Sequence, residues 1–298
     1  MSVVTFGFAQ LLRVLPRAAI SKALGTLCEA ELPSPVMRGI VSTYCRAYSV
    51  ATHEADPTAL PYRSFDAFFT RKLRDGLRPI EGDDRTMVSP ADGKLSELGV
   101  VQPHGAIRVK GQEYTLGELL DDEGWARELR GGGFGVVYLS PRDYHRVHAP
   151  IAGTITRVRG IEGDRYPVNA IGERYIPGLF VRNRRVVVEV QSPQWGRVAV
   201  VLVGAMIVGR MTVLGVDQPD VQGDHRVTPP RAITRGEEIG AFHLGSTVVF
   251  AVGPGHFERF VRGTGEVAYG QALSVARSTD GGNGGNGGND GSKKARRS

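Results

Sequence analysis

Apolar residues near the start of the chain recur at helical spacing. Val4, Phe8, Leu11 and Leu15 are three or four residues apart, and a similar pattern resumes after a proline. A spacing of three and four residues is typical of an amphipathic helix. We therefore expect two short amphipathic helices within residues 2–27.

Two further segments carry helix-start signals. Residues 34–50 begin with Ser34 as a capping residue and Pro35 at the first helical position, and residues 64–73 begin with Ser64 as a cap. Serine is a favoured N-cap because its hydroxyl accepts a hydrogen bond from the first turn, and proline is tolerated there because its missing N–H has no partner anyway. Both segments are predicted to be helical.

From about Pro79 onward, the pattern changes to short β-branched stretches separated by Gly, Pro, Asn and Asp. The stretches predict strands at 135–140, 153–158, 184–190, 197–213 and 246–252. In this half only residues 115–120, where Thr115 and Glu118 form a capping box, are expected to be helical. The expected fold class is α+β, with N-terminal helices followed by a mainly antiparallel, barrel-like β body.

The chain accordingly divides into three expected regions. These are a helical region at 1–75, a β-rich domain at 76–277 and a tail at 278–298. The tail is rich in Gly and Asn and cannot bury enough apolar surface to order itself. We expect it to be disordered.

The charge excludes one class of partner. The formal net charge is +6, and the last eighteen residues supply four basic residues against Asp290, or +3, which leaves only +3 for the rest of the chain. With no basic stripe interleaved with aromatic residues, nucleic-acid binding is not expected.

Cys28 and Cys45 form no disulfide framework and are expected to be reduced. No run of about twenty apolar residues predicts a membrane span, and no signal peptide is expected.

Three short stretches combine reactive side chains with tight turns: "SPADGK" (89–94), "SPRDYHRVHAP" (140–150) and "LGST" (244–247). Each adjoins a predicted strand, where a turn can present side chains on a rigid scaffold. These stretches are the candidate chemistry of the chain.

His145 and His148 allow more than one interpretation. Three residues apart on a strand, they would point to opposite faces, and no third ligand is evident, so no metal site is expected. Either they are hydrogen-bonded turn residues, or they act as acid and base, because the pKa of histidine lies nearest neutrality.

Asp92 and Ser246 complete a possible constellation. Asp92 is by default a turn residue, because Asp-Gly is a strong turn signal. However, an aspartate that orients a histidine, which in turn deprotonates a serine, is the logic of a catalytic triad. Ser246 follows Gly245, which has no side chain to shield its carbonyl. An activated Ser246 could therefore attack its own chain.

Taken together, these motifs resemble the bacterial pyruvoyl-dependent phosphatidylserine decarboxylase family. The resemblance runs from about residue 62 to 252 and preserves the family's order and spacing. The stretches that carry it are "FDAFFTRKLRDGLRPI" (65–80), "SPADGK" (89–94), "KGQEYTLGELL" (110–120), "YHRVHAP" (144–150), "GLFVRNRRV" (178–186), "VGAMIVGRM" (203–211) and "FHLGSTVV" (242–249).

The resemblance implies that the chain cuts itself between Gly245 and Ser246. Asp92, His148 and Ser246 would form the processing triad, with His148 as the base and Asp92 orienting it. Attack by the Ser246 hydroxyl turns the amide into an ester, and elimination followed by hydrolysis leaves a pyruvoyl group and ammonia. Thr247 is the nearest candidate donor to the oxyanion formed on the way.

The same resemblance implies the second reaction and its setting. A Schiff base between the pyruvoyl cofactor derived from Ser246 and the substrate amine accepts the electrons released with CO₂, and His145 is the candidate acid that protonates the carbon. Phosphatidylserine in membranes would become phosphatidylethanolamine. We expect a heterodimer of the large and small chains, attached peripherally to the cytoplasmic face of the cell membrane through residues 1–75. A homo-oligomer is left open.

Two alternatives remain at this stage. Residues 148–158 and 234–242 are similar to the half-motifs of biotinyl, lipoyl and phosphotransferase carrier domains, which would make His148 a phosphate carrier. A histidine-dependent metallopeptidase is the other. His243, just before the Gly-Ser bond, is either a strand side chain or a second proton carrier.

Overall fold

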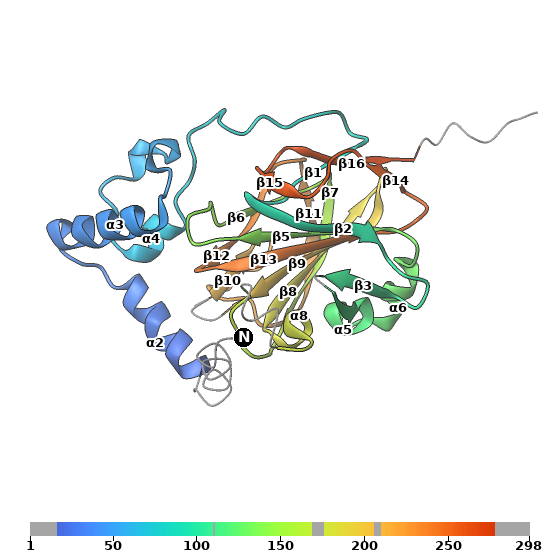
Figure 1. Cartoon of the computed structure of the whole chain (residues 1–298), viewed down its shortest axis with the longest axis horizontal. Coiled ribbons are helices and arrows are strands. Elements are labelled where there is room, and N and C mark those ends of the chain that lie inside the picture. The colour runs from blue at the N-terminus through green and yellow to red at the C-terminus, as the bar shows by residue number, and fades with distance from the viewer. Residues whose placement is uncertain (1–16, 110, 169–175, 206–209, 278–298) are drawn as a thin grey trace, which may run out of the picture.

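The computed structural model describes residues 17–109, 111–168, 176–205 and 210–277. The first helix predicted within residues 2–27 and the tail expected at 278–298 lie outside these ranges. In the N-terminal region the helices are α2 (Arg17–Glu29), α3 (Ser34–Tyr48) and α4 (Phe65–Phe69), with two 3₁₀ turns, η1 (Thr52–Glu54) and η2 (Pro57–Ala59). These helices lie together on one side of the β body (Figure 1).

The predicted helix starts are correct at one position and wrong at another. The Ser64 hydroxyl accepts a hydrogen bond of 3.1 Å from the Ala67 N–H, as expected of a cap. The N-cap of α3 is Pro33 rather than Ser34, and no side chain caps this helix. The ring fixes φ of Pro33 at −51°, so the chain enters the helix without a side-chain acceptor. The helix α4 is shorter than predicted, because Leu73 instead forms a β-bridge.

A large antiparallel sheet forms the centre of the β body. Its eight strands are, in spatial order, β11 (Gly223–Ile233), β7 (Gly153–Ile161), β8 (Arg185–Ser192), β9 (Gly196–Gly204), β13 (Ser246–Val252), β5 (Gly133–Leu139), β2 (Gly93–Val100) and β15 (Gly265–Val267). Valines of β8 and β9, Val248 and Phe250 are fully buried. Two-sided burial explains why these strands appear in the sequence as continuous β-branched runs.

Smaller sheets and helices surround this sheet. The three-stranded sheets are β10 (Arg210–Val213), β12 (Glu238–His243) and β6 (Arg146–His148), and β1 (Thr86–Val88), β16 (Ala272–Ala276) and β14 (Phe257–Phe260). A hairpin pairs β3 (Ala106–Val109) with β4 (Gln112–Thr115), and the helices are α5 (Leu116–Leu120), α6 (Glu123–Glu128) and α8 (Leu179–Arg182). The Thr115 hydroxyl caps α5 as predicted, whereas α6 and α8 were not predicted.

The α+β fold class is confirmed. Every described pair of strands is antiparallel, and helices are concentrated before β1. The predicted stretch 197–213 is not one strand, because β9 ends at Gly204 and β10 belongs to another sheet. Among the described helices, none has the length and apolar character needed to cross a bilayer.

Candidate active site

Four strands of the large sheet begin or end at the same place. Ser246, the first residue of β13, pairs with Leu139 at the end of β5 and with Gly204 at the end of β9. The strand β2 begins beside the same end of β5, since Lys94 pairs with Tyr138. The segments before β2, after β5 and before β13, which carry the three reactive motifs, therefore meet at one end of the sheet.

The chain passes from β12 to β13 through Leu244 and Gly245. Leu244 is buried and has a φ of 90°, a region that a residue with a side chain enters at a cost of roughly 1–3 kcal/mol. At Gly245 a Cβ atom would have no described atom within 4 Å. For Ser246 the structure describes the backbone, which begins β13. The peptide that leads to Ser246 is thus strained at Leu244 and uncrowded at Gly245.

His148, at the end of β6, is buried with a partner on each ring nitrogen. Nδ1 lies 2.7 Å from the Gly236 carbonyl oxygen and Nε2 lies 3.2 Å from the Tyr144 hydroxyl. Because a carbonyl oxygen only accepts, Nδ1 carries the hydrogen and Nε2 offers its lone pair. Burial lowers the pKa of His148 to about 4, although the bond to Gly236 opposes this shift. The ring is therefore neutral at pH 7, and the Nε2 lone pair, which accepts from the Tyr144 hydroxyl, is its basic site.

Asp92, in the turn before β2, is buried and bound by Arg78. The guanidinium donates from Nε at 3.1 Å and from Nη2 at 2.7 Å to Oδ2, and Nη2 also lies 2.7 Å from a carboxylate oxygen of Glu54. The backbone N–H of Tyr269 donates to Oδ1 at 2.8 Å. Burial raises the pKa of Asp92, and the bonds from Arg78 and Tyr269 oppose that rise.

Tyr269 connects Asp92 with His148. Its N–H binds Asp92, and its ring stacks on the His148 imidazole, with centroids 3.7 Å apart and planes inclined by 3°. The His148 N–H also donates to the Pro90 carbonyl at 2.7 Å, which ties β6 to the turn that carries Asp92. No hydrogen bond between described atoms joins Asp92 to the His148 ring. The two residues thus belong to one cluster through Tyr269.

His145, in the segment that follows β5, is fully buried. Its Nδ1 donates to the Asp143 carbonyl at 2.8 Å, its ring lies 4.1 Å from that of Phe69, and its Nε2 has no hydrogen-bond partner among the described atoms. Burial lowers the pKa of His145 to about 3. The backbone carbonyl of His145 accepts from Phe242 at 3.0 Å, three residues before Gly245. His145 therefore presents a neutral, unpartnered Nε2 at the end of the sheet where β13 begins.

The structure places Thr247 and His243 differently. The Thr247 hydroxyl is buried in β13 and has no partner among the described atoms. His243, at the end of β12, has its Nδ1 2.7 Å from one carboxylate oxygen of Asp66 in α4. Asp66 also accepts from Arg210 at 3.0 Å. His243 is therefore part of an ion-pair cluster that joins the N-terminal helices to the β body.

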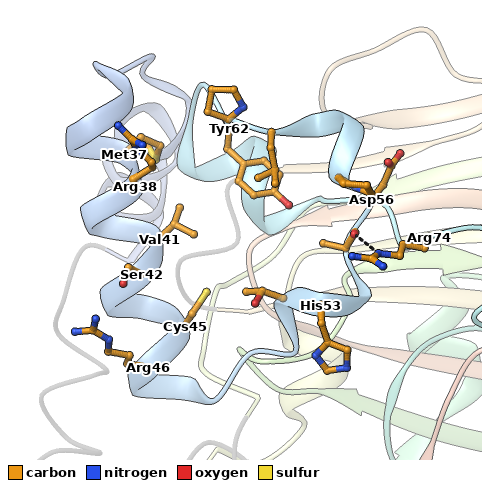
Figure 2. Close-up of a pocket in the computed structure, with 15 residues that line it drawn as sticks. Met37, Arg38, Val41, Ser42, Cys45, Arg46, His53, Asp56, Tyr62 and Arg74 are labelled. Carbon is orange, nitrogen blue, oxygen red and sulfur yellow. Dashed lines mark hydrogen bonds between the residues drawn. The ribbon is translucent and has the colours of Figure 1, made fainter.

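Two pockets adjoin the segment from Ser49 to Asp56. One, of about 270 Å³, is lined by Asp92 and Tyr144 and by three arginines, Arg71, Arg78 and Arg142. The other, of about 770 Å³, lies between α3 and residues 52–62. Figure 2 shows the side chains that line it, among them Met37, Val41, Cys45 and Tyr62. Ala55 and Leu60 also line it. Only the first pocket contains a residue of the candidate site.

Several site residues were missed by the sequence analysis. Tyr144 and Arg71 lie inside motifs that were recognised, but their roles depend on neighbours that are distant in sequence. Glu54 and Tyr269 lie outside every recognised motif, and no local signal identifies them.

Within the described residues, no group of three or more His, Cys, Asp or Glu side chains has the arrangement of a metal site. Cys28 and Cys45 are both free and half-buried.

Comparison with known proteins adds independent information. A family model described as phosphatidylserine decarboxylase matches residues 65–274. A protein of Anaeromyxobacter sp. (strain K) named phosphatidylserine decarboxylase proenzyme is 38% identical over 255 residues, which cover 83% of this chain and 90% of the relative. Proteins of the same name are 37% identical in Myxococcus xanthus (83% and 89% covered) and 38% identical in Acinetobacter baylyi (81% and 85% covered). The matched range includes every site residue named above except Glu54.

Proposed function

The chain belongs to the phosphatidylserine decarboxylase family, and we propose that it converts phosphatidylserine into phosphatidylethanolamine after cutting itself between Gly245 and Ser246. The observation that carries this proposal is the meeting of three motifs at one end of the large sheet, where Ser246 begins β13. The family match includes both segments that resembled carrier half-motifs. No feature of the described site favours a carrier or a metallopeptidase.

Self-cleavage uses the neutral His148 as the base. His148 Nε2 takes the proton of the Ser246 hydroxyl, whose oxygen attacks the Gly245 carbonyl. The C–N bond of the peptide breaks as the ester forms, and His148 returns the proton to the Ser246 nitrogen, which leaves as an amine. The strain at Leu244 is relieved when this backbone is released, which favours the reaction. Thr247 donates to the oxyanion from its unpartnered hydroxyl or its N–H. Elimination removes the Cα proton of residue 246 and expels Gly245 as the carboxylate end of the large chain. This leaves dehydroalanine, which water hydrolyses to a pyruvoyl group and ammonia.

Asp92 acts in this step together with its neighbours. An aspartate in a triad orients the histidine and stabilises its charged form. In the described arrangement Arg78 and the Tyr269 N–H hold Asp92, and Tyr269 stacks on His148. Asp92 therefore supports His148 through the position of Tyr269.

The described residues fit a pyruvoyl group at position 246. The unpartnered Nε2 of His145 lies at the end of the sheet where this group would form. When formed there, the group would supply a ketone able to accept the electrons released with CO₂. His145 Nε2, neutral in a buried site, takes the proton that the substrate ammonium gives up and returns it to the carbon that has lost CO₂.

The two chains remain paired after cleavage. The small chain, residues 246–298, begins with β13, which is hydrogen-bonded along its length to β5 on one side and to β9 on the other. Both neighbours belong to the large chain, residues 1–245. Cleavage and pyruvoyl formation change only the pairing of residue 246 at the strand's end and leave those of Thr247 to Val252. We therefore infer a stable heterodimer.

The region 1–75 is the proposed membrane attachment. In its described part, large apolar side chains are exposed on α2, on α3 and near η2: Leu27, Val36, Ile40, Tyr48 and Leu60. Val36 and Ile40 are four residues apart and share a face of α3, as in a helix that lies in a bilayer interface. We infer peripheral attachment to the cytoplasmic face of the cell membrane, with residues 76–277 as the catalytic domain.

Substitution of Ser246 tests the proposed function. Ser246→Ala removes the only nucleophile in the scheme, so the chain should stay at full length and release no CO₂ from phosphatidylserine vesicles. Ser274→Ala is the matched control, because Ser274 is a fully buried serine of the same small chain. It should be cut and active. Cleavage or decarboxylation by Ser246→Ala would contradict the proposal, as would loss of both in a folded Ser274→Ala.

Membrane attachment is tested by vesicle flotation. The double variant Val36→Ser/Ile40→Ser should bind phosphatidylserine vesicles more weakly, because two apolar side chains no longer enter the bilayer. Val100→Ser removes a comparably exposed valine from β2 and should bind like the wild type. Equal binding by all three proteins would refute the assignment of α3.

A further inference from the structure

Arg71 is a buried cation without an anionic partner. It is 5% exposed, and its Nε has no hydrogen-bond partner among the described atoms. Its one described hydrogen bond is a long one, 3.4 Å from Nη2 to the Arg142 carbonyl. In the described parts of the chain, no carboxylate lies within ion-pair distance of its guanidinium. Arg71 thus differs from the other buried arginines.

The contrast with Arg184 and Arg185 is direct. Arg184 is equally buried but donates to the Asp220 carboxylate and to the Val221 carbonyl, both at 2.7 Å. Arg185 donates to four backbone carbonyls. Burying a charged group without such partners is costly, and buried charges are therefore normally paired. An arginine stays protonated even where burial lowers its pKa, as it does here.

The unpaired charge of Arg71 lines the pocket of about 270 Å³ beside Asp92. The other two arginines of this pocket already have anionic partners. Arg78 binds Asp92 and Glu54, and Arg142 lies 3.6 Å from Asp143 and from Glu266. Arg71 is therefore the pocket cation whose charge is uncommitted.

The carboxylates that line the pocket have other partners and do not pair with Arg71. Asp92 and Glu54 share Arg78, and Asp143 accepts from the N–H and the hydroxyl of Ser140, each at 2.7 Å. Glu54 acts on Arg71 only at longer range, where it raises the pKa of the guanidinium. The pocket is large enough for a phosphate group and holds one surplus donor.

The pocket also adjoins the proposed proton carrier. The Arg142 carbonyl accepts from Arg71, and the carbonyl of the next residue, Asp143, holds His145 Nδ1. Phe69, two residues before Arg71, packs its ring on His145. In phosphatidylserine a single CH₂ group separates the phosphate oxygen from the carbon that loses CO₂. A phosphate held in this pocket would therefore keep the reacting carbon near His145.

We propose that Arg71 binds the phosphodiester anion of the phosphatidylserine headgroup, an assignment that rests on the proposed function. The substrate also has an α-carboxylate, but that group must lose its charge as it leaves. A buried arginine paired with it would stabilise the ground state more than the transition state and would slow the reaction. The phosphodiester keeps its charge throughout, so pairing with Arg71 positions the substrate at no cost to the chemical step.

The test uses the processed enzyme and the variants Arg71→Gln and Arg71→Lys. Intact mass is measured first, and both variants should be cut between Gly245 and Ser246 like the wild type. With phosphatidylserine in mixed micelles, Arg71→Gln should raise KM roughly tenfold to a hundredfold, the scale of losing charge-assisted hydrogen bonds. Arg71→Lys should recover part of the loss. Arg108→Gln removes an equal charge from an exposed position on β3 and should leave KM unchanged.

Competition assays distinguish the phosphodiester from the carboxylate. Glycerophosphoserine contains both anions, whereas O-methyl-L-serine has the amine and carboxylate but no phosphate. In Arg71→Gln the Ki of glycerophosphoserine should rise at least tenfold, while that of O-methyl-L-serine stays as in the wild type.

Three results would overturn the assignment. An equal rise of both Ki values would mean that Arg71 binds the carboxylate. An unchanged KM would mean that it binds neither group. Loss of processing in both variants would assign it to folding or self-cleavage. An uncut wild type would instead contradict the proposed function, so the two failures can be told apart.

Discussion

The middle of the eight-stranded sheet and the end that carries Ser246 differ in how well their side chains are packed and their polar groups are hydrogen-bonded. In the middle, β13 pairs continuously with β5 and β9, and its apolar side chains are fully buried. At the end, Leu244 has a positive φ, and buried polar atoms of Arg71, His145 and Thr247 have no partner among the described atoms. Unsatisfied buried polar groups and strain destabilise a fold. The comparison indicates that the middle supplies the stability that lets the end remain reactive.

Loss of His148 should have the largest effect, and only at the end of the sheet. His148→Ala removes the base for Ser246, so self-cleavage should slow by about a hundredfold to ten-thousandfold. Electrophoresis over time measures the fraction of cut chain. Tyr144→Phe removes only the hydroxyl that faces Nε2, so the base is kept and cleavage should proceed. Normal cleavage by His148→Ala would contradict its role.

A cavity in the middle of the sheet should lower the stability of the fold but leave self-cleavage intact. Phe250→Ala truncates a fully buried ring of β13 and should lower the free energy of unfolding by about 3–5 kcal/mol. Urea unfolding measures the change, in a Ser246→Ala background so that every chain compared is uncut. With Ser246 restored, Phe250→Ala should still be cut at temperatures where it is folded. Stability equal to that of the parent would show that the middle of the sheet does not carry the fold.

Acid should lower the free energy of unfolding, because His145 and His148 are buried in their neutral form at the end of the sheet. Burial lowers the pKa of His145 to about 3 and of His148 to about 4, below the usual 6.5, so the unfolded chain binds more protons between these values. Their contribution to stability is therefore complete above about pH 6.5 and is lost as the pH falls toward 4, on the order of 2 kcal/mol per histidine by pH 5. The raised pKa of Asp92 acts in the opposite direction.

The measurement is urea unfolding at pH 7, 6 and 5 in the Ser246→Ala background. His148→Ala in that background should show a smaller loss between pH 7 and pH 5 than its parent, because one titrating group is gone. An identical pH dependence would show that His148 is not held neutral by burial.

The smallest effect should come from the unpaired arginine. Arg184→Met breaks a buried ion pair and should cost about 1–3 kcal/mol of unfolding free energy. Arg71→Met removes a cation that has no anion, so stability should stay the same or rise. The same urea series compares the two. A loss for Arg71→Met as large as for Arg184→Met would show that Arg71 serves the fold.

The same comparison explains what sequence could predict. The strand at 246–252 was predicted with its observed bounds, because its β-branched residues are buried on both faces, and Ser64 and Thr115 were recognised as caps from local chemistry. The α3 cap was wrong, because Pro33 sets the entry of the chain without a side-chain acceptor.

The partners of the site residues could not be predicted in the same way. The Tyr269 N–H reaches Asp92 across 177 positions, and the Gly236 carbonyl reaches His148 across 88. These contacts depend on which strands pair, which no local pattern specifies. The motif sequences therefore identified Asp92, His145, His148 and Ser246 as candidates. Only the fold shows that Arg71, Arg78 and Tyr269 lie beside them.

Intact mass spectrometry of the purified, active wild-type protein tests the central claim most directly. We predict two chains, residues 1–245 and 246–298, with the smaller chain lacking a free amino terminus and gaining the mass of an oxime after treatment with hydroxylamine. A single chain of full length in an active preparation, or a small chain that begins with an unmodified serine amine, would contradict the account.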